Sequence, residues 1–316
     1  MHKIITLVPV VKPYDWGDSS YIKSLLEDSD VKEIPPVQAE LWMGAHNNGC
    51  ARVLETSQSL REFIDENPSF VSPDFRKGDD FPFLFKILAI KKPLSIQCHP
   101  DAEAARKGFE EGNVNYTDPN AKVEMYYALK PTLMLCGLRK TYTKDAEAEA
   151  MHEYIQGFYP GDSTADYVYR MNIVELDEGE AVCIKPGTLH CYISGCGIEL
   201  MTNSDNVVRA GLTSKRIDKE ELNRIADKKP SMPGLLSSLE DCGGEHFYMQ
   251  EGPTLSVLND GYYFDDTATT ARIVICLEGS AVINEEFTLK KGQVCMISSG
   301  VPLSAEVEGR VFTACI

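Results

Sequence analysis

Two stretches of this sequence align without gaps and set its architecture: Gly179-Glu-Ala-Val-Cys-Ile-Lys-Pro-Gly187 and Gly292-Gln-Val-Cys-Met-Ile-Ser-Ser-Gly300. Each begins with glycine, continues as a short apolar strand and reaches a second glycine eight residues on. Such internal similarity indicates one structural unit that is used twice. Three residues past the second glycine, the first copy has His190 and the second has Leu303. We therefore expect two β-barrel units, of which only the first kept a metal ligand.

Two such barrels correspond to a double cupin-like, or jelly-roll, β-barrel architecture. Short apolar strands separated by turns run from Tyr167 onward and fill the C-terminal region. Helical patterns interrupt the strands as insertions, at residues 57–67, 100–111, 143–158 and 218–225. We predict a mainly β chain with helical insertions, divided into a metal-bearing half at residues 1–230 and a metal-free half at residues 231–316.

The metal-ligand candidates begin in the run Leu94-Ser-Ile-Gln-Cys-His-Pro-Asp101. Side chains alternate between the faces of a strand, so Gln97 and His99 project together while Cys98 points the other way. Glu124 could add a carboxylate, and a later histidine would complete a mixed nitrogen and oxygen site for a divalent metal. The alternative is a hydrogen-bonded Gln-His pair without a metal.

Charge and length limit the classes of function. The 316 residues include 31 Lys and Arg against 48 Asp and Glu, which gives a formal net charge of -17. A protein that binds the phosphate backbone of nucleic acid needs clustered positive charge, so we expect no nucleic-acid partner. Any anionic substrate would have to meet a local group of basic side chains.

The cysteines and the N-terminal run bear on the compartment. The ten cysteines form no C-x-x-C pair, and most lie in apolar runs, as is typical of buried reduced thiols in a cytoplasmic protein. The first eleven residues are briefly apolar, but Pro9 interrupts them and no small-residue cleavage site follows. We expect a first strand there, with no signal peptide and no membrane span.

Three runs of this sequence resemble a known family. They are Gln97-Cys-His-Pro-Asp101, Asp118-Pro-Asn-Ala-Lys-Val-Glu-Met125 and, most specifically, Ser204-Asp-Asn-Val-Val-Arg-Ala-Gly-Leu-Thr213. The family is type I mannose-6-phosphate isomerase, also called phosphomannose isomerase, and the similarity covers most of the chain. The resemblance implies a cytoplasmic cupin enzyme with one Zn²⁺ per chain that interconverts mannose 6-phosphate and fructose 6-phosphate. It also implies four metal ligands, Gln97, His99, Glu124 and His190.

Aldose-ketose isomerisation moves a proton between C1 and C2 through an enediol, so it needs a base, an electrophile and an anchor for the phosphate. Arg209 resembles the catalytic arginine of the family, and a structural ion pair is its alternative role. For the base, Glu199 and Asp205 are both candidates, and Glu199 is favoured. Tyr192, two residues past His190 on the same strand face, could relay a proton or contact the substrate.

Four further residues line the pocket of the family by resemblance, and we expect the phosphate anchor among them: Lys86, Ser95, Lys122 and Lys215. A lysine inside an apolar strand, as at Lys86, needs an anion nearby. Lys122 lies two residues before Glu124, which places it beside that ligand, although it could also be a solvated lysine after Pro119. Which of the four contacts phosphate stays open at this stage.

Two departures from the family pattern concern the pocket wall. Ala121 and Val123 stand where the family usually has His and Pro, and the helical segment after Leu138 is shorter than in eukaryotic members. The rival functions are a non-catalytic sugar-binding cupin and a cupin oxygenase, which would use a redox metal and a His-rich ligand set. We expect a phosphorylated hexose as the partner and leave the oligomeric state open.

Overall fold

The computed structural model describes residues 3–250, 252–267 and 269–316, which form two compact units. The terminal unit consists of Met1–Tyr14, Asp18–Ile87 and Ser237–Ile316, and the central unit consists of Asp15–Gly17 and Leu88–Leu236. The first strands of the chain thus group with its last ones, whereas the expected halves followed the order of the sequence. The predicted mainly β class with helical insertions is confirmed.

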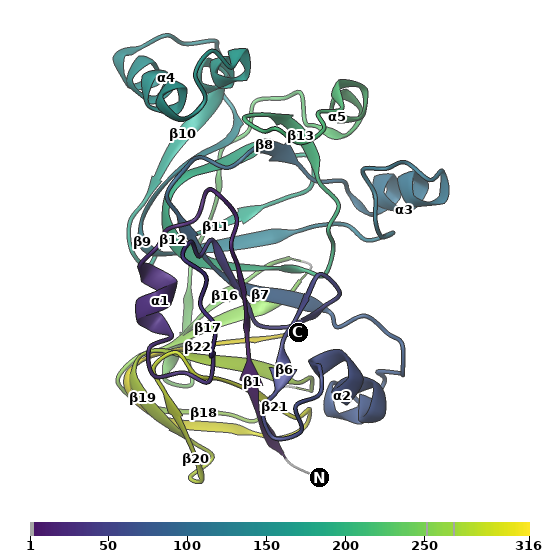
Figure 1. The fold of residues 1–316 in the computed structure, drawn as a ribbon, viewed down its shortest axis with the longest axis vertical. Helices are drawn as coiled ribbons and strands as arrows, with labels where there is room; N and C mark the ends of the chain where they lie inside the picture. The colour runs from purple at the N-terminus through teal and green to yellow at the C-terminus, as the bar shows by residue number, and fades with distance from the viewer. Residues whose placement is uncertain (1–2, 251, 268) are drawn as a thin grey trace. The chain divides into compact units, whose positions relative to one another are not determined.

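The central unit is built around two long antiparallel strands, β9 (Glu124–Leu138) and β12 (His190–Thr202), which lie side by side in Figure 1. The strand order is β14-β11-β9-β12, while β10 pairs with β9 and β8 pairs with both β12 and β13. Its remaining elements are β8 (Ile96–Cys98), α3 (Ala102–Glu110), α4 (Ala146–Phe158), η2 (Ser163–Tyr169), β10 (Met171–Leu176), β11 (Ala181–Ile184), β13 (Val208–Gly211), α5 (Lys219–Ile225) and β14 (Gly234–Leu236).

The two faces of this sheet bury different apolar clusters. Leu135 and Cys191 belong to the cluster that also contains Met151 and Ile155 of α4. Their neighbours along the strands, such as Tyr192, belong to a second cluster formed by strand residues of the opposite face. Alternation along β9 and β12 therefore gives the sheet one face covered by helices and one inner face, as a barrel requires.

The terminal unit has the longer sheet, of order β15-β16-β17-β22-β19-β21-β1-β6, with β18 on β22 and β20 on β19. Its apolar core includes Tyr263, Val274, Leu289 and Val311, and the unit also buries polar side chains such as that of Arg272. The strands of this sheet are β1 (Ile4–Val8), β6 (Arg52–Val53), β15 (Leu239–Asp241), β16 (Gly244–Tyr248), β17 (Thr254–Leu258), β18 (Gly261–Asp265), β19 (Arg272–Ile283), β20 (Phe287–Lys290), β21 (Val294–Ile297) and β22 (Leu303–Cys315).

Short elements complete the terminal unit, among them the pairs β2 with β3 and β4 with β5. They are β2 (Val10–Lys12), α1 (Tyr21–Leu25), β3 (Glu40–Trp42), β4 (Ala45–His46), β5 (Gly49–Cys50), α2 (Leu60–Glu66) and η1 (Pro68–Phe70). The strand β7 (Phe83–Ile90) is buried at every position, as its apolar run predicted, and contributes 83–87 to the terminal unit and 88–90 to the central unit.

The internal repeat is present in the structure as a strand in each unit. β11 and β21 occupy the same place in the two copies, and the next strands, β12 and β22, begin at His190 and Leu303. The four bounding glycines have left-handed φ angles, which only glycine adopts at little cost: Gly179 96°, Gly187 85°, Gly292 77° and Gly300 67°. Both His190 and Leu303 are fully buried, the latter in the apolar core of its unit.

A helix forms within each of the four predicted ranges, and side-chain caps fix where each helix begins. The side chains of Asp101, Asp145 and Asp218 each accept a hydrogen bond from a backbone amide in the first turn of α3, α4 and α5. Ser59 and Glu62 form a capping box at the start of α2. These bonds satisfy amides that a helix cannot pair internally, so they fix the helix starts.

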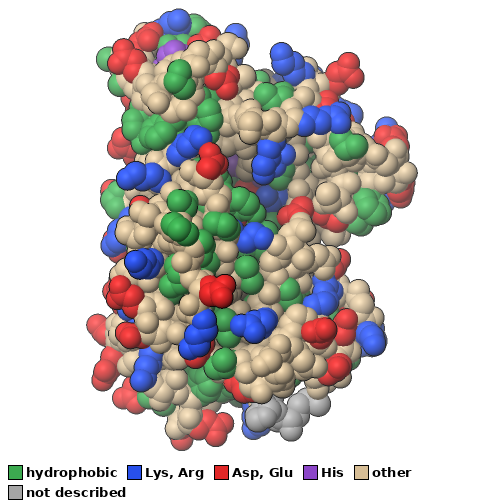
Figure 2. Space-filling view, in the orientation of Figure 1, with side chains coloured by type: hydrophobic (Ala, Val, Ile, Leu, Met, Phe, Trp, Pro, Cys, Tyr) green, Lys and Arg blue, Asp and Glu red, His purple; other side chains and the backbone are tan. Residues whose placement is uncertain are grey.

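The surface carries charges of both signs (Figure 2), and the cysteine thiols are free, as the composition led us to expect. Lysine and arginine side chains are interspersed with aspartate and glutamate on the face that Figure 2 shows. All ten cysteines are free, and most of them are buried. Across the described ranges, no helix combines the length and the apolar character that a membrane crossing needs.

Candidate metal centre

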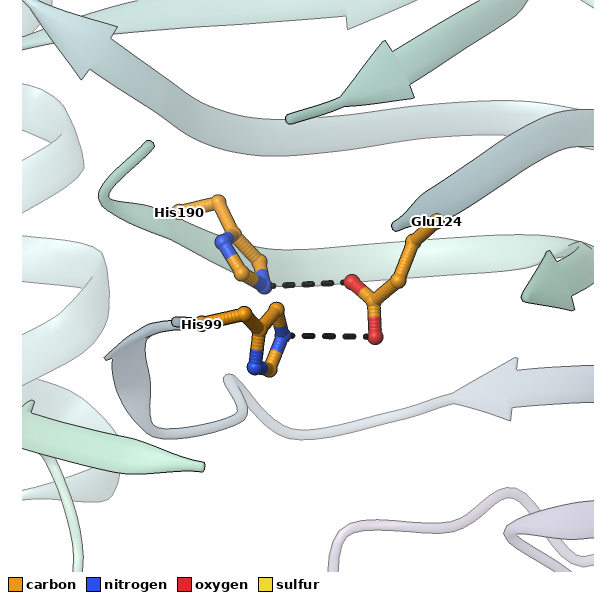
Figure 3. A group of neighbouring side chains, drawn as sticks. All are labelled: His99, Glu124 and His190. Atoms are coloured by element: carbon orange, nitrogen blue, oxygen red, sulfur yellow. Dashed lines mark ion pairs between the residues drawn. The ribbon is translucent and has the colours of Figure 1, made fainter. Parts of the chain in front are cut away.

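Three side chains of the central unit converge on one point, as Figure 3 shows. His99 Nε2 lies 3.3 Å from Glu124 Oε1, and His190 Nε2 lies 3.4 Å from Glu124 Oε2. The candidate ligand atoms all lie within 4.8 Å of one another. All three side chains are inaccessible to solvent. The chain thus gathers two imidazoles and a carboxylate in its interior.

Strand register places these residues on the inner face. His190 on β12 lies opposite Gln97 on β8, and Gln97 lies opposite Arg209 on β13. Residues that face each other across an antiparallel pair project from the same side of the sheet. Cys98 belongs instead to the helix-covered cluster on the other face, as the alternation predicted.

The second nitrogen of each ring determines the tautomer. His99 Nδ1 lies 2.8 Å from the backbone oxygen of Asn206, and His190 Nδ1 lies 3.0 Å from the backbone oxygen of Thr188. A carbonyl oxygen only accepts, so each Nδ1 carries the hydrogen and each Nε2 keeps its lone pair. Both lone pairs therefore belong to the atoms that face Glu124, which is the arrangement of metal-binding histidines.

The donor set fits a divalent cation. His99 Nε2 and both carboxylate oxygens of Glu124 are buried; apart from the contacts of this carboxylate with the two imidazoles and with Lys122, they have no hydrogen-bond partner among the described residues. Burial raises the pKa of Glu124, but Lys122 and the two histidines outweigh it and hold that pKa well below its usual value. Burial, followed by the charge of Lys122, lowers the pKa of His99 to about 4. The carboxylate is thus charged and the imidazole neutral, the forms that bind a metal.

Gln97 reaches the same point as an amide. Its Nε2 lies 3.2 Å from His190 Nε2, and its Oε1 accepts a hydrogen bond from Ser95 Oγ at 3.1 Å. The amide nitrogen thus donates to the imidazole lone pair in this structure. Ligation through Oε1 requires the flipped amide, which Ser95 can still hold because its hydroxyl both donates and accepts.

Lys122 is part of this centre and is not a solvated lysine. Its side chain is 7% exposed, and its Nζ lies 2.8 Å from Glu124 Oε1. The start of β9 and the segment just before it therefore bring a carboxylate and an ammonium, two residues apart, to the same place. A buried cation this close keeps the carboxylate ionised.

The other polar groups of the inner face are spread around the centre. The guanidinium of half-buried Arg209 makes no hydrogen bond or ion pair with any other described residue, so the alternative of a structural ion pair has no support. The buried hydroxyl of Tyr192 has no hydrogen-bond partner among the described residues. Burial, and then the charges of Glu199 and Glu124, raise the pKa of Tyr192 well above its usual value. Glu199 itself is buried and lies opposite Tyr126 on β9.

The structure shows the immediate surroundings of three further candidates. Lys86 belongs to the terminal unit, where its Nζ is 3.9 Å from Glu40 Oε2 and 5.1 Å from the centre of the Trp42 ring. Lys215 is exposed in the segment between β13 and α5. The half-buried Asp205 donates its backbone amide to the side chain of Asp118.

Sequence reasoning missed the backbone acceptors of the two histidines. Thr188 lies two residues before His190, directly after the turn signal Pro186-Gly187; that signal predicts a turn but not that the Thr188 carbonyl accepts from His190. Asn206 was noted only as part of the specific run 204–213, although it is fully buried and heavily hydrogen-bonded. A buried asparagine in a conspicuous polar run was the signal that could have found it.

Comparisons with known proteins agree with this site. The family model described as "Phosphomannose isomerase type I, catalytic domain" matches residues 4–141. Mannose-6-phosphate isomerase of Escherichia coli (strain K12) is 28% identical, with 96% of this chain and 97% of that protein covered. The Rattus norvegicus protein of the same name is 30% identical, with 72% and 74% covered. A crystal structure of zinc-bound mannose 6-phosphate isomerase superposes with a TM-score of 0.86 at 26% identity, covering 99% of both chains. The chain belongs to the type I phosphomannose isomerase family.

Proposed function

We propose that this protein is a zinc-dependent isomerase that interconverts mannose 6-phosphate and fructose 6-phosphate. The buried centre of His99, Glu124 and His190, with the ammonium of Lys122 beside it, carries the proposal. The named relatives support the choice of sugar. Because all ten cysteines are free, we also propose that the protein works in the cytoplasm.

The ligands that we propose for Zn²⁺ are Gln97, His99, Glu124 and His190. When bound, the metal would act as a Lewis acid that polarises the substrate oxygens and stabilises negative charge on them. The two Nδ1 hydrogen bonds hold the imidazoles in the orientation that such binding needs. One carboxylate and three neutral ligands leave the site with net positive charge, which suits an anionic enediolate.

The side chains around this centre have assigned roles in the proposal. A base removes the proton from C2 of the aldose and returns it to C1, and we propose Glu199, with Asp205 as the other candidate. Arg209 has no other partner among the described residues and is suited to stabilise the enediolate. Tyr192 offers an unpaired hydroxyl as a substrate contact. We propose that the phosphate of the substrate is bound by one or more of four residues: Lys86, Ser95, Lys122 and Lys215.

The test is a coupled assay of purified protein that follows fructose 6-phosphate formed from mannose 6-phosphate. We expect activity, its loss after exhaustive chelation, and recovery with zinc under anaerobic as well as aerobic conditions. Metal analysis should give about one equivalent per chain, because Leu303 stands at the second-copy position of His190. Two tightly held ions, or full activity without metal, would contradict the proposal.

The same assay separates the rival functions. A non-catalytic sugar-binding protein would bind the phosphosugar without turnover, whereas an oxygenase would consume oxygen and need a redox metal. The named relatives, all mannose-6-phosphate isomerases, support the isomerase over both rivals. Two imidazoles and one carboxylate also hold the iron of non-haem oxygenases, so the measurement of oxygen consumption decides between these two functions.

We expect Arg209→Lys to act on turnover more than on substrate binding. Lysine keeps the charge but loses the planar fork, so an interaction made mainly with the enediolate should weaken and kcat should fall about a hundredfold. Steady-state kinetics on mannose 6-phosphate measure this effect. An unchanged kcat with a raised KM would assign Arg209 to ground-state phosphate binding instead.

A further inference from the structure

We propose that Asn206 is the positioning residue of the metal centre: it clamps the segment that delivers Lys122 and Glu124, and it orients His99. The inference rests on the proposed zinc site and assigns a role to a residue that is not itself a ligand. Asn206 is fully buried and lies in the loop between β12 and β13.

The side chain of Asn206 holds the turn that precedes Lys122. Its Oδ1 accepts hydrogen bonds from the backbone amides of Thr117 at 2.9 Å and Asp118 at 3.4 Å. Its Nδ2 donates to the backbone oxygens of Asp118 at 2.8 Å and Asn120 at 2.9 Å, and to Asp118 Oδ1 at 3.1 Å. One amide thus bonds to four backbone groups of a turn whose residues are exposed or half-buried, and so ties this turn to the buried interior.

The backbone of the same residue holds His99. Its carbonyl oxygen accepts from His99 Nδ1 at 2.8 Å, which fixes both the tautomer and the ring plane. A shift of the Asn206 side chain would therefore move two parts of the centre together: the ring of His99 and the start of β9 with Lys122 and Glu124. The separation between His99 Nε2 and the Glu124 carboxylate depends on both.

Further hydrogen bonds join the same two segments, 117–123 and 202–206, around Asn206. Thr202 Oγ1 donates to the oxygen of Ala121 at 2.9 Å and accepts from the amide of Val123 at 3.1 Å. Ser204 Oγ accepts from the backbone amide of Asn206 at 3.2 Å. Hydrogen bonds of polar residues thus connect segment 202–206 to segment 117–123. Among these residues, Asn206 also contacts His99, a proposed metal ligand.

The chemistry of the position demands asparagine. The turn presents amide donors on one side and carbonyl acceptors on the other, so the side chain must both accept and donate. Aspartate has the same shape but only accepts when ionised, and it would face the carboxylate of Asp118. Asn206→Asp therefore removes the three donated bonds with almost no change in volume.

The experiment measures zinc affinity directly, by competition with a chelator of known affinity, for the parent and Asn206→Asp. Loss of a residue that orients the metal ligands by hydrogen bonds typically weakens metal binding about 10- to 100-fold. We expect a rise of that size in the zinc Kd. Asp118→Ala removes the carboxylate that accepts from Asn206 Nδ2 and should also raise the zinc Kd. This second variant keeps the test decisive if Asn206→Asp does not fold.

Asn284→Asp is the matched control in the terminal unit. Asn284 also clamps a turn, since its Nδ2 donates to the oxygen of Pro302 at 2.9 Å and its Oδ1 accepts from the amide of Ser304 at 2.7 Å. It should lower the Tm of the metal-free protein without changing zinc affinity. A positioning role predicts that Asn206→Asp changes the Kd, whereas a merely structural role predicts the pattern of the control.

The outcomes for the site and for the clamp are distinguishable. If the parent binds no zinc, the proposed function fails and this inference fails with it. If the parent binds one zinc and a folded Asn206→Asp binds it equally tightly, the proposed function stands and the positioning role is overturned.

Discussion

Replacing either His99 or His190 by alanine is expected to abolish stoichiometric zinc binding and to remove nearly all isomerase activity. Each ring supplies a buried Nε2 lone pair within 3.4 Å of the Glu124 carboxylate, and no other described histidine lies in this cluster. Without the Lewis acid the developing charge loses several kcal/mol of stabilisation, so kcat should fall by about a thousandfold or more.

His152→Ala is the control for these two variants. His152 on α4 stacks on Tyr169, and its Nε2 lies 3.1 Å from Asp166 Oδ1, so its contacts are outside the centre. This variant should keep about one equivalent of zinc. The ligand assignment would be wrong if His152→Ala lost its metal, or if His99→Ala or His190→Ala retained it, as measured by metal analysis after dialysis.

Local sequence rules were sufficient to predict much of the proposed site. Alternation along a strand predicted that Gln97 and His99 face together and that Lys122 lies beside Glu124. Lys122 does lie beside Glu124, although it precedes β9 and is not part of a strand. The repeat singled out His190 because a strand bounded by two glycines occurs in both units and only one copy continues into histidine. These predictions depend on periods of a few residues, which any strand expresses.

What the sequence could not show depends on contacts between distant segments. An anion was expected near Lys86, but only the fold places Glu40 there. Pairing of β1 with β21 draws the start of the chain into the terminal unit, and no local pattern encodes that pairing. The role of Asn206 was equally hidden, because it is exercised partly by a backbone carbonyl, which every residue possesses.

Lys122→Met should be the most damaging change outside the ligands. The substitution keeps the length of the side chain and removes a buried ammonium that lies 2.8 Å from Glu124 Oε1. The substitution removes a positive charge beside the carboxylate of the centre and beside the expected site of an anionic substrate, so we expect kcat/KM on mannose 6-phosphate to fall by roughly a thousandfold, which corresponds to about 4 kcal/mol of transition-state stabilisation. Steady-state kinetics over a wide substrate range measure the loss, and activity close to that of the parent would exclude Lys122 from the reaction.

Free mannose distinguishes the two ways in which Lys122 can act. The net charge of -17 opposes a dianionic substrate, and screening at physiological salt confines that repulsion to about 8 Å, so a nearby cation must offset it. We expect free mannose to be a poor substrate for the parent. If Lys122 anchors the phosphate, Lys122→Met loses activity on mannose 6-phosphate while its slow rate on mannose and its zinc affinity stay unchanged. If Lys122 instead supports the centre through Glu124, Lys122→Met loses activity on both substrates and its zinc affinity changes. The residue that binds the phosphate would then be Lys86, Ser95 or Lys215.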